Sequence, residues 1–157
     1  MLILKDPAPD SAELGYVRRA LEQGELVVVP TDTVYGIAAL AGDEAAVSRL
    51  YAAKGRDVSQ ATAVIFGSVT AAREAFPELS ARATWALQSL LPGPWTLIVE
   101  NPAGHMPWLT GGAAAPIGLR VPAGALDLPP IAASSANRSG EPTIQRVQEL
   151  DGELAST

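Results

Sequence analysis

The segment VVVPTDTVYGIAAL, residues 27–40, decides how the chain is expected to fold. The apolar run over residues 26–29 ends at Pro30, which is typical of a short strand buried on both faces. A plain surface turn favours Gly, Asn or Pro, but here two threonines flank Asp32. We interpret this polar break as the rim of a cavity, with the valines as its buried floor strand and residues 34–40 returning the chain to the core.

The remaining pattern predicts an α/β (α+β) chain with a twisted, open, mixed sheet and helices on its faces. Apolar runs bounded by turn residues predict strands over residues 25–30, 61–68, 95–100, 117–122 and 130–134, the last of them short and central. Helical periodicity with capping residues predicts helices over residues 12–23, 43–54, 69–76, 79–91 and 144–150. Trp95 is expected in the core and His105 on the surface.

The composition limits the classes of protein to which this chain is expected to belong. The length of 157 residues suits one domain, and 48% hydrophobic with 18% charged residues suits a compact fold. With no cysteine and one histidine, a disulfide scaffold, a thiolate nucleophile and a Cys- or His-based metal site are not expected. The net charge of -6 argues against broad capture of nucleic acid. Neither a signal peptide nor an apolar run of membrane-spanning length is found, so the expected compartment is the cytoplasm and no membrane partner is expected.

Three polar clusters follow predicted elements: PTDT at residues 30–33, KGR at 54–56 and SSAN at 134–137. Lys54 and Arg56 suit a polyphosphate, because one is a point charge and the other a bidentate fork. They also suit a helix C-terminus stabilised by its macrodipole. The hydroxyls and amide around Ser135 and Asn137 suit an anion, or an ordinary turn that caps the next helix.

Two further residues are candidates for ligand binding. Arg120 lies inside an apolar strand, where an arginine needs a partner: either an acid such as Asp32 or an anionic ligand. Asp32 itself is expected either to face Arg120 or to cap the turn. Thr110 precedes two glycines, so this segment either lets the backbone approach a ligand closely or is a flexible loop.

Taken in order, six segments resemble the YrdC-like family of threonylcarbamoyl-AMP synthases. They are VVVPTDTVYGIAAL, AVSRLYAAKGR, LLPGPWTLIV, WLTGG, IGLRVP and SSANRSGEPT, and they span residues 27–143. The resemblance implies an open α/β sheet with a large concave cavity. It also implies a nucleotidyltransferase that joins L-threonine, bicarbonate and ATP into threonylcarbamoyl-AMP and pyrophosphate, for threonylcarbamoyladenosine modification of tRNA.

The resemblance also assigns roles to residues. Thr31 would contact L-threonine, Lys54 and Arg56 would hold the ATP phosphates, and the nucleotide and carboxylate side would be lined by Thr110, Arg120, Ser135 and Asn137. Mg²⁺ would arrive with ATP, since the chain shows no dedicated ligand set. No residue is identified as a catalytic general base. Partners implied are tRNA-modification proteins, and family members are described as binding double-stranded RNA.

The sequence departs from the family pattern at several places. Asp57 stands where many members have proline, and some members have a histidine at a place that matches this chain near Ile65. Between RVP and SSAN the family has a helix, where this chain has AGALDLPPIAA. We expect a single YrdC-like domain over residues 1–157 that lacks the family's C-terminal closing segment. The alternative functions are a non-catalytic protein that binds nucleotide or double-stranded RNA and, ranked last, a carbamoyl-transfer module working with a partner.

Overall fold

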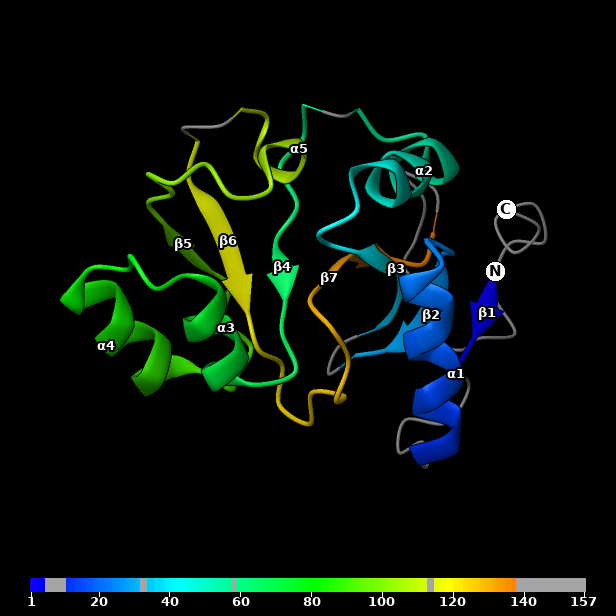
Figure 1. Cartoon of the computed structure of the whole chain (residues 1–157), viewed down its shortest axis with the longest axis horizontal. Coiled ribbons are helices and arrows are strands. Elements are labelled where there is room, and N and C mark those ends of the chain that lie inside the picture. The colour runs from blue at the N-terminus through cyan, green and yellow to red at the C-terminus, as the bar shows by residue number, and fades with distance from the viewer. Residues whose placement is uncertain (5–10, 32–33, 58, 113–114, 138–157) are drawn as a thin grey trace.

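The computed structural model describes residues 1–4, 11–31, 34–57, 59–112 and 115–137, which fold around a seven-stranded mixed sheet (Figure 1). The strand order is β1-β2-β3-β7-β4-β6-β5. The strands are β1 (Leu2–Ile3), β2 (Val27–Pro30), β3 (Tyr35–Leu40), β4 (Val64–Ile65), β5 (Leu97–Val99), β6 (Ile117–Arg120) and β7 (Ile131–Ser135). The predicted open, mixed sheet is confirmed.

Among the helices of the described residues, three begin at a residue whose side chain accepts a hydrogen bond from a free backbone N–H. The described helices are α1 (Ser11–Glu22), α2 (Glu44–Lys54), α3 (Val69–Ala75), α4 (Ala81–Leu90) and α5 (Pro107–Thr110). The Asp43 carboxylate accepts a hydrogen bond from the Ala46 N–H at 3.0 Å, and the Ser68 and Ser80 hydroxyls cap α3 and α4 in the same way. Gly55 ends α2 at φ 61°, in the left-handed region that favours glycine.

The segment over residues 27–40 forms a hairpin in the middle of the fold. β2 pairs antiparallel with β3, with Val28 opposite Ile37, and β3 pairs antiparallel with β7. β7 also pairs antiparallel with β4, which confirms its predicted central position. The ends of β2 and β7 therefore lie at the same end of the sheet, on either side of β3, because Pro30 lies opposite Tyr35 and Gly36 lies opposite Ser135.

One face of the sheet is covered by four helices. Alternate strand residues such as Val28, Ile37, Val64, Leu119 and Ala132 point to this face and are almost completely buried. They pack against apolar side chains of α2, α3, α4 and α5 in the larger of two core clusters, which includes Leu50, Ala72, Leu87 and Leu109. This close-packed layer of helices holds the sheet rigid.

In the part of the chain that the structure describes, a helix covers the opposite face over only part of its width. Val17 and Leu21 of α1 are buried with Val27, Val29 and Ala38 of β2 and β3. Figure 1 shows α1 lying at the β1–β2 side of the sheet. Over β4 and β6 the described residues leave two cavities on the same face. The period-2 alternation of the strands thus directs their outward side chains into an open concave surface.

Several predictions need correction. β1, β3 and α5 were not expected as separate elements, because β1 is very short, YGIAAL has no polar alternation, and α5 is a single turn opened by Pro107. Trp95 is 57% exposed, so its predicted core position is wrong; it lies in the turn before the edge strand β5. The predicted helix over residues 144–150 lies outside the described residues. None of the described helices is long and apolar enough to cross a membrane.

Candidate functional site

A polar pocket of about 190 Å³ lies on the open face of the sheet. Its floor is formed by alternate residues of four strands, among them Gly36 of β3, Ile65 of β4, Arg120 of β6 and Ala133 of β7. Side chains or backbone of the following residues complete its lining: Thr31, Val34, Ala63, Thr96, Ser134 and Ser135. Three of the predicted site residues, Thr31, Arg120 and Ser135, therefore share one pocket.

Thr31 sits at the end of β2, where the hairpin turns. Its N–H donates to the Val34 carbonyl at 3.2 Å, and its hydroxyl donates to the same oxygen at 2.6 Å. The Val34 N–H in turn donates to the Thr31 hydroxyl at 3.3 Å. These contacts hold the Thr31 side chain at the pocket rim, where its hydroxyl can be shared with a ligand. Asp32 lies outside the described residues, so the two predicted roles for it stay predictions.

Arg120 is the charged side chain among the residues that line this pocket. Arg120 is half-buried at the end of β6, and it lies opposite Ile65 of the neighbouring strand β4. Gly118, two residues earlier on the same face, lies so close to Ala63 that an added Cβ would approach the Ala63 Cβ to 3.0 Å. The small residues Gly118 and Ala63 therefore pack closely against one another beside Arg120.

Lys54 joins α2 to the end of β7. Only 4% of the residue is exposed, and its ammonium donates to the carbonyl of Ser135 and, at 2.7 Å, to the carbonyl of Asn137. Burial, and to a smaller extent the Arg56 guanidinium, lowers the pKa of Lys54 from 10.5 to about 8. Lys54 thus places a cation beside the SSAN segment while it fixes the position of that segment.

Asn137 is also buried, with 8% of the residue exposed. Its N–H donates to the Ser135 carbonyl at 2.9 Å, which makes a tight turn immediately after β7. The Lys54 ammonium therefore faces two carbonyls of one turn. The sequence prediction that Lys54, Ser135 and Asn137 gather at one place agrees with this arrangement, although their binding roles stay predictions.

Arg56 and Thr110 lie beside a different segment, over residues 59–62. The Arg56 guanidinium donates to the Gln60 side-chain oxygen at 3.1 Å and to the Ala61 carbonyl at 2.8 Å. Thr110 is buried, its hydroxyl donates to the Gly112 carbonyl at 2.6 Å, and the neighbouring Leu109 carbonyl accepts the Thr62 N–H at 2.9 Å. Neither Arg56 nor Thr110 lines the polar pocket.

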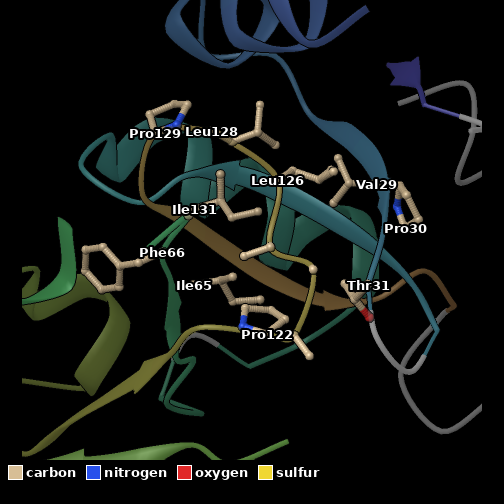
Figure 2. A pocket seen from close by; sticks show the side chains of 14 residues that line it. Val29, Pro30, Thr31, Ile65, Phe66, Pro122, Leu126, Leu128, Pro129 and Ile131 are labelled. Carbon is tan, nitrogen blue, oxygen red and sulfur yellow. The ribbon is translucent and has the colours of Figure 1, made fainter. Parts of the chain in front are cut away.

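A second cavity, of about 240 Å³, adjoins the polar pocket. Figure 2 shows side chains of β2, β4, β7 and the segment over residues 122–129 gathered around it, with Thr31 at one side. Apart from Thr31, the lining residues are glycines or have apolar side chains: Val29, Pro30, Ile65, Phe66, Gly67, Pro122, Ala123, Gly124, Ala125, Leu126, Leu128, Pro129 and Ile131. We call it the apolar cavity. The sequence analysis did not predict it, although the missing helix between residues 122 and 131 was a signal.

Sequence reasoning also missed Thr96 as a lining residue of the polar pocket. Thr96 lies between Trp95 and the first residue of β5, and nothing in this local sequence marks it as a pocket-lining residue. His105 is not the plain surface residue that was expected. Its Nε2 lies 2.8 Å from a Glu78 carboxylate oxygen, and its ring meets that of Phe76 edge-on at 5.0 Å between centroids. This pair lies away from the polar pocket.

Comparison with known proteins gives consistent results. The Sua5/YciO/YrdC family model, described as "Telomere recombination", matches residues 19–157. A protein named putative threonylcarbamoyl-AMP synthase from Mycobacterium leprae is 35% identical over 155 residues, covering 95% of this chain and 70% of that protein. The threonylcarbamoyl-AMP synthase of Pyrococcus abyssi is 35% identical over 136 residues, covering 82% of this chain and 38% of that protein.

A crystal structure of P. abyssi Sua5 complexed with L-threonine superposes with a TM-score of 0.76 at 29% sequence identity. The match covers 99% of this chain and 46% of that one, so this chain spans about half the length of the archaeal protein. The shared architecture is the open mixed sheet described above.

Proposed function

Because the chain belongs to the Sua5/YciO/YrdC family, we propose that it is an L-threonylcarbamoyladenylate synthase that serves tRNA modification. The reaction joins L-threonine, bicarbonate and ATP to give threonylcarbamoyl-AMP, pyrophosphate and water. The observation that carries the proposal is the position of Thr31, Arg120 and Ser135 around one pocket, with the Lys54 ammonium bonded to the strand end that forms its edge. Relatives named for this activity, and a related structure complexed with L-threonine, support it.

The proposed chemistry has two steps. The amino nitrogen of L-threonine forms a C–N bond to the carbon of bicarbonate, with loss of water, and gives a carbamate. A carbamate oxygen then forms a bond to the α-phosphorus of ATP while the bond from that phosphorus to the pyrophosphate oxygen breaks. Proximity supplies much of the rate, because the reactants are held on one rigid sheet face. Exclusion of water protects the labile carbamate.

In this proposal the protein binds and orients rather than transfers protons. Thr31 contacts L-threonine through the hydroxyl held at the hairpin end. The Arg120 guanidinium stabilises a carboxylate or phosphate on the pocket floor, and Lys54 with Arg56 stabilises the charge that develops on the leaving pyrophosphate. Thr110, Ser135 and Asn137 line the nucleotide side.

Mg²⁺ is proposed to enter with ATP. Across the described part of the chain there is no group of three or more His, Cys, Asp or Glu side chains that could hold a metal ion. Phosphate oxygens and water are the ligands that Mg²⁺ takes most readily. The ion would therefore be held mainly by the nucleotide, and Lys54 and Arg56 would face the phosphate oxygens that the ion leaves exposed.

The test is a direct assay of the purified chain with labelled ATP, L-threonine, bicarbonate and Mg²⁺, in which threonylcarbamoyl-AMP and pyrophosphate are measured. Both products are expected, and both should disappear when L-threonine or bicarbonate is omitted. Arg56→Ala and Ser135→Ala should each weaken ATP binding by about 1–3 kcal/mol. Arg82→Ala on the exposed surface of α4 is the matched control. Binding of ATP without product would contradict the synthase and favour a non-catalytic nucleotide-binding protein.

A further inference from the structure

The Arg56 guanidinium is held along one of its two hydrogen-bonding edges. Its Nε–H donates to the Gln60 side-chain oxygen at 3.1 Å, and its Nη2 donates to the Ala61 carbonyl at 2.8 Å. These two nitrogens lie on the same edge, so two consecutive residues occupy that fork. The other fork, made of Nη1 and the second hydrogen of Nη2, donates to none of the residues that the structure describes. One bidentate fork of Arg56 therefore remains available to a ligand.

The segment that holds Arg56 is anchored in the core at its far end. The guanidinium lies over the ring of Tyr51, with 5.8 Å between the guanidinium carbon and the ring centroid, and only 2% of Tyr51 is exposed. The Tyr51 hydroxyl donates to the Thr62 hydroxyl at 3.0 Å, and the Thr62 N–H donates to the Leu109 carbonyl at 2.9 Å. The two acceptors that hold Arg56 are therefore attached to a fixed part of the fold.

Arg56 lies close to a second cation. Its charge contributes, after burial, to the lowered pKa of Lys54, so the two side chains are near enough to repel each other. Neither forms an ion pair with an acid in the described part of the chain, and the Asp57 carboxylate accepts the Ser59 N–H at 2.8 Å instead. The Lys54 ammonium has three N–H donors and uses two on carbonyls. An anion that both cations bind would relieve their repulsion.

We propose that Gln60 is a positioning residue for anion binding: its side-chain oxygen fixes the Arg56 guanidinium so that the free fork meets two oxygens of a phosphate group. The inference deepens the proposed function, on which it rests for the identity of the anion as the phosphates of ATP or pyrophosphate. Gln60 acts through Arg56 and makes no contact with the ligand. Its side chain is exposed, so a substitution at this position empties no place in the core.

The expected effect is the entropy of ordering one arginine side chain. An arginine that is free to move occupies many rotamers, and fixing it when an anion binds opposes the affinity. Gln60 orders the guanidinium before the ligand arrives, so Gln60→Ala should weaken the binding of ATP and of pyrophosphate by about three- to tenfold. The loss should disappear in Arg56→Lys, because an ammonium is a point charge with no fork to orient.

The experiment measures dissociation constants of the full chain for ATP and for pyrophosphate, each with Mg²⁺, by isothermal titration calorimetry. Four proteins are compared: the wild type, Gln60→Ala, Arg56→Lys and the double variant. Gln60→Ala should weaken both ligands about three- to tenfold in the wild-type background and less than about twofold in the Arg56→Lys background. Gln88→Ala, at an exposed glutamine of α4, is the matched control and should change neither constant. The urea midpoint of Gln60→Ala should equal that of the wild type, since the substitution changes an orientation and not the core.

The outcomes separate this inference from the proposed function. A loss of affinity confined to the background that carries Arg56 supports the inference. No loss, a gain, or an equal loss in both backgrounds would overturn it, and a loss for Arg56→Lys alone would leave the proposed phosphate role of Arg56 standing. Coupling between Gln60 and Arg56 in pyrophosphate binding, without formation of threonylcarbamoyl-AMP, would instead overturn the synthase and leave the inference standing. If the wild type binds neither ligand, both are overturned.

Discussion

Replacing Lys54 with methionine tests whether this residue holds α2 against the end of β7. The ammonium donates to the carbonyls of Ser135 and Asn137, more than eighty residues away along the chain. Hydrogen bonds from a charged group contribute about 1.5–3 kcal/mol each, so two contribute about 3–6 kcal/mol. Burial of the charge, which lowers the pKa below its ordinary value, opposes this, so the expected loss comes mainly from the two carbonyls that methionine would leave without a donor. We therefore expect the free energy of unfolding to fall by about 2–4 kcal/mol.

Urea unfolding followed by circular dichroism and tryptophan fluorescence measures this loss. Methionine keeps the apolar stem of the side chain, so the loss reports the ammonium rather than a cavity. Arg82→Met is the control, since Arg82 is an exposed cation on α4 and its loss should change the free energy by less than about 0.5 kcal/mol. Equal, small effects of the two substitutions would refute the view that Lys54 couples α2 to β7.

The difference in the free energy of unfolding between the wild-type protein and Lys54→Met should change with pH in a defined direction. Lys54 has a pKa of about 8 in the folded chain and 10.5 as its ordinary value, so the unfolded chain holds more protons between these pH values. The free energy of unfolding of the wild-type protein should therefore rise, relative to that of Lys54→Met, as the pH increases from about 8 to 10.5. A falling difference in that range would show that the folded state stabilises the ammonium rather than penalising it.

Three further predictions concern binding and local geometry. ATP affinity should fall as the pH rises through about 8, by at most about tenfold per pH unit, because the Lys54 ammonium is lost, and Lys54→Met should flatten this profile in calorimetric titrations. Gly67→Ala should destabilise the fold by about 1–3 kcal/mol, because its Cβ would meet the Leu126 carbonyl oxygen at 2.8 Å, whereas Gly42→Ala, with open space around it, should not destabilise it. Asp43→Ala removes the N-cap of α2 and should lower the free energy of unfolding by about 0.5–2 kcal/mol in urea; no change would mean that the cap hydrogen bond contributes nothing.

The elements with strong local signals could be predicted from the sequence. The helix over residues 44–54 has a carboxylate cap and a terminal glycine, and it forms between those two residues. The run of valines before Pro30 forms a strand buried on both faces. β3 was missed as a strand because its residues alternate between two buried environments, so no polar period marks it. Burial on both faces depends on neighbouring elements that a local pattern does not reveal.

The sequence indicated candidate site residues, but it did not indicate how the fold arranges them. Thr31, Arg120 and Ser135 share a pocket because β2, β6 and β7 direct alternate side chains to one face, which follows from strand order rather than from spacing. Arg56 instead turns toward Gln60, a local contact that the motif KGR does not encode. The apolar cavity depends on how one loop packs against Gly67, and single-sequence patterns do not predict such tertiary contacts.

Among the described residues the helices cover one face of the sheet only in part, and this has a consequence for how ligands affect stability. A sheet face that lacks a helix gains its missing apolar layer only when something else lies on it. A ligand in the cavities over β4 and β6 would supply part of that layer and would extend the hydrophobic core. A ligand at one hundred times its dissociation constant would add about 2.7 kcal/mol to the free energy of unfolding. The melting temperature of this protein should therefore serve as a direct screen for the molecules it binds.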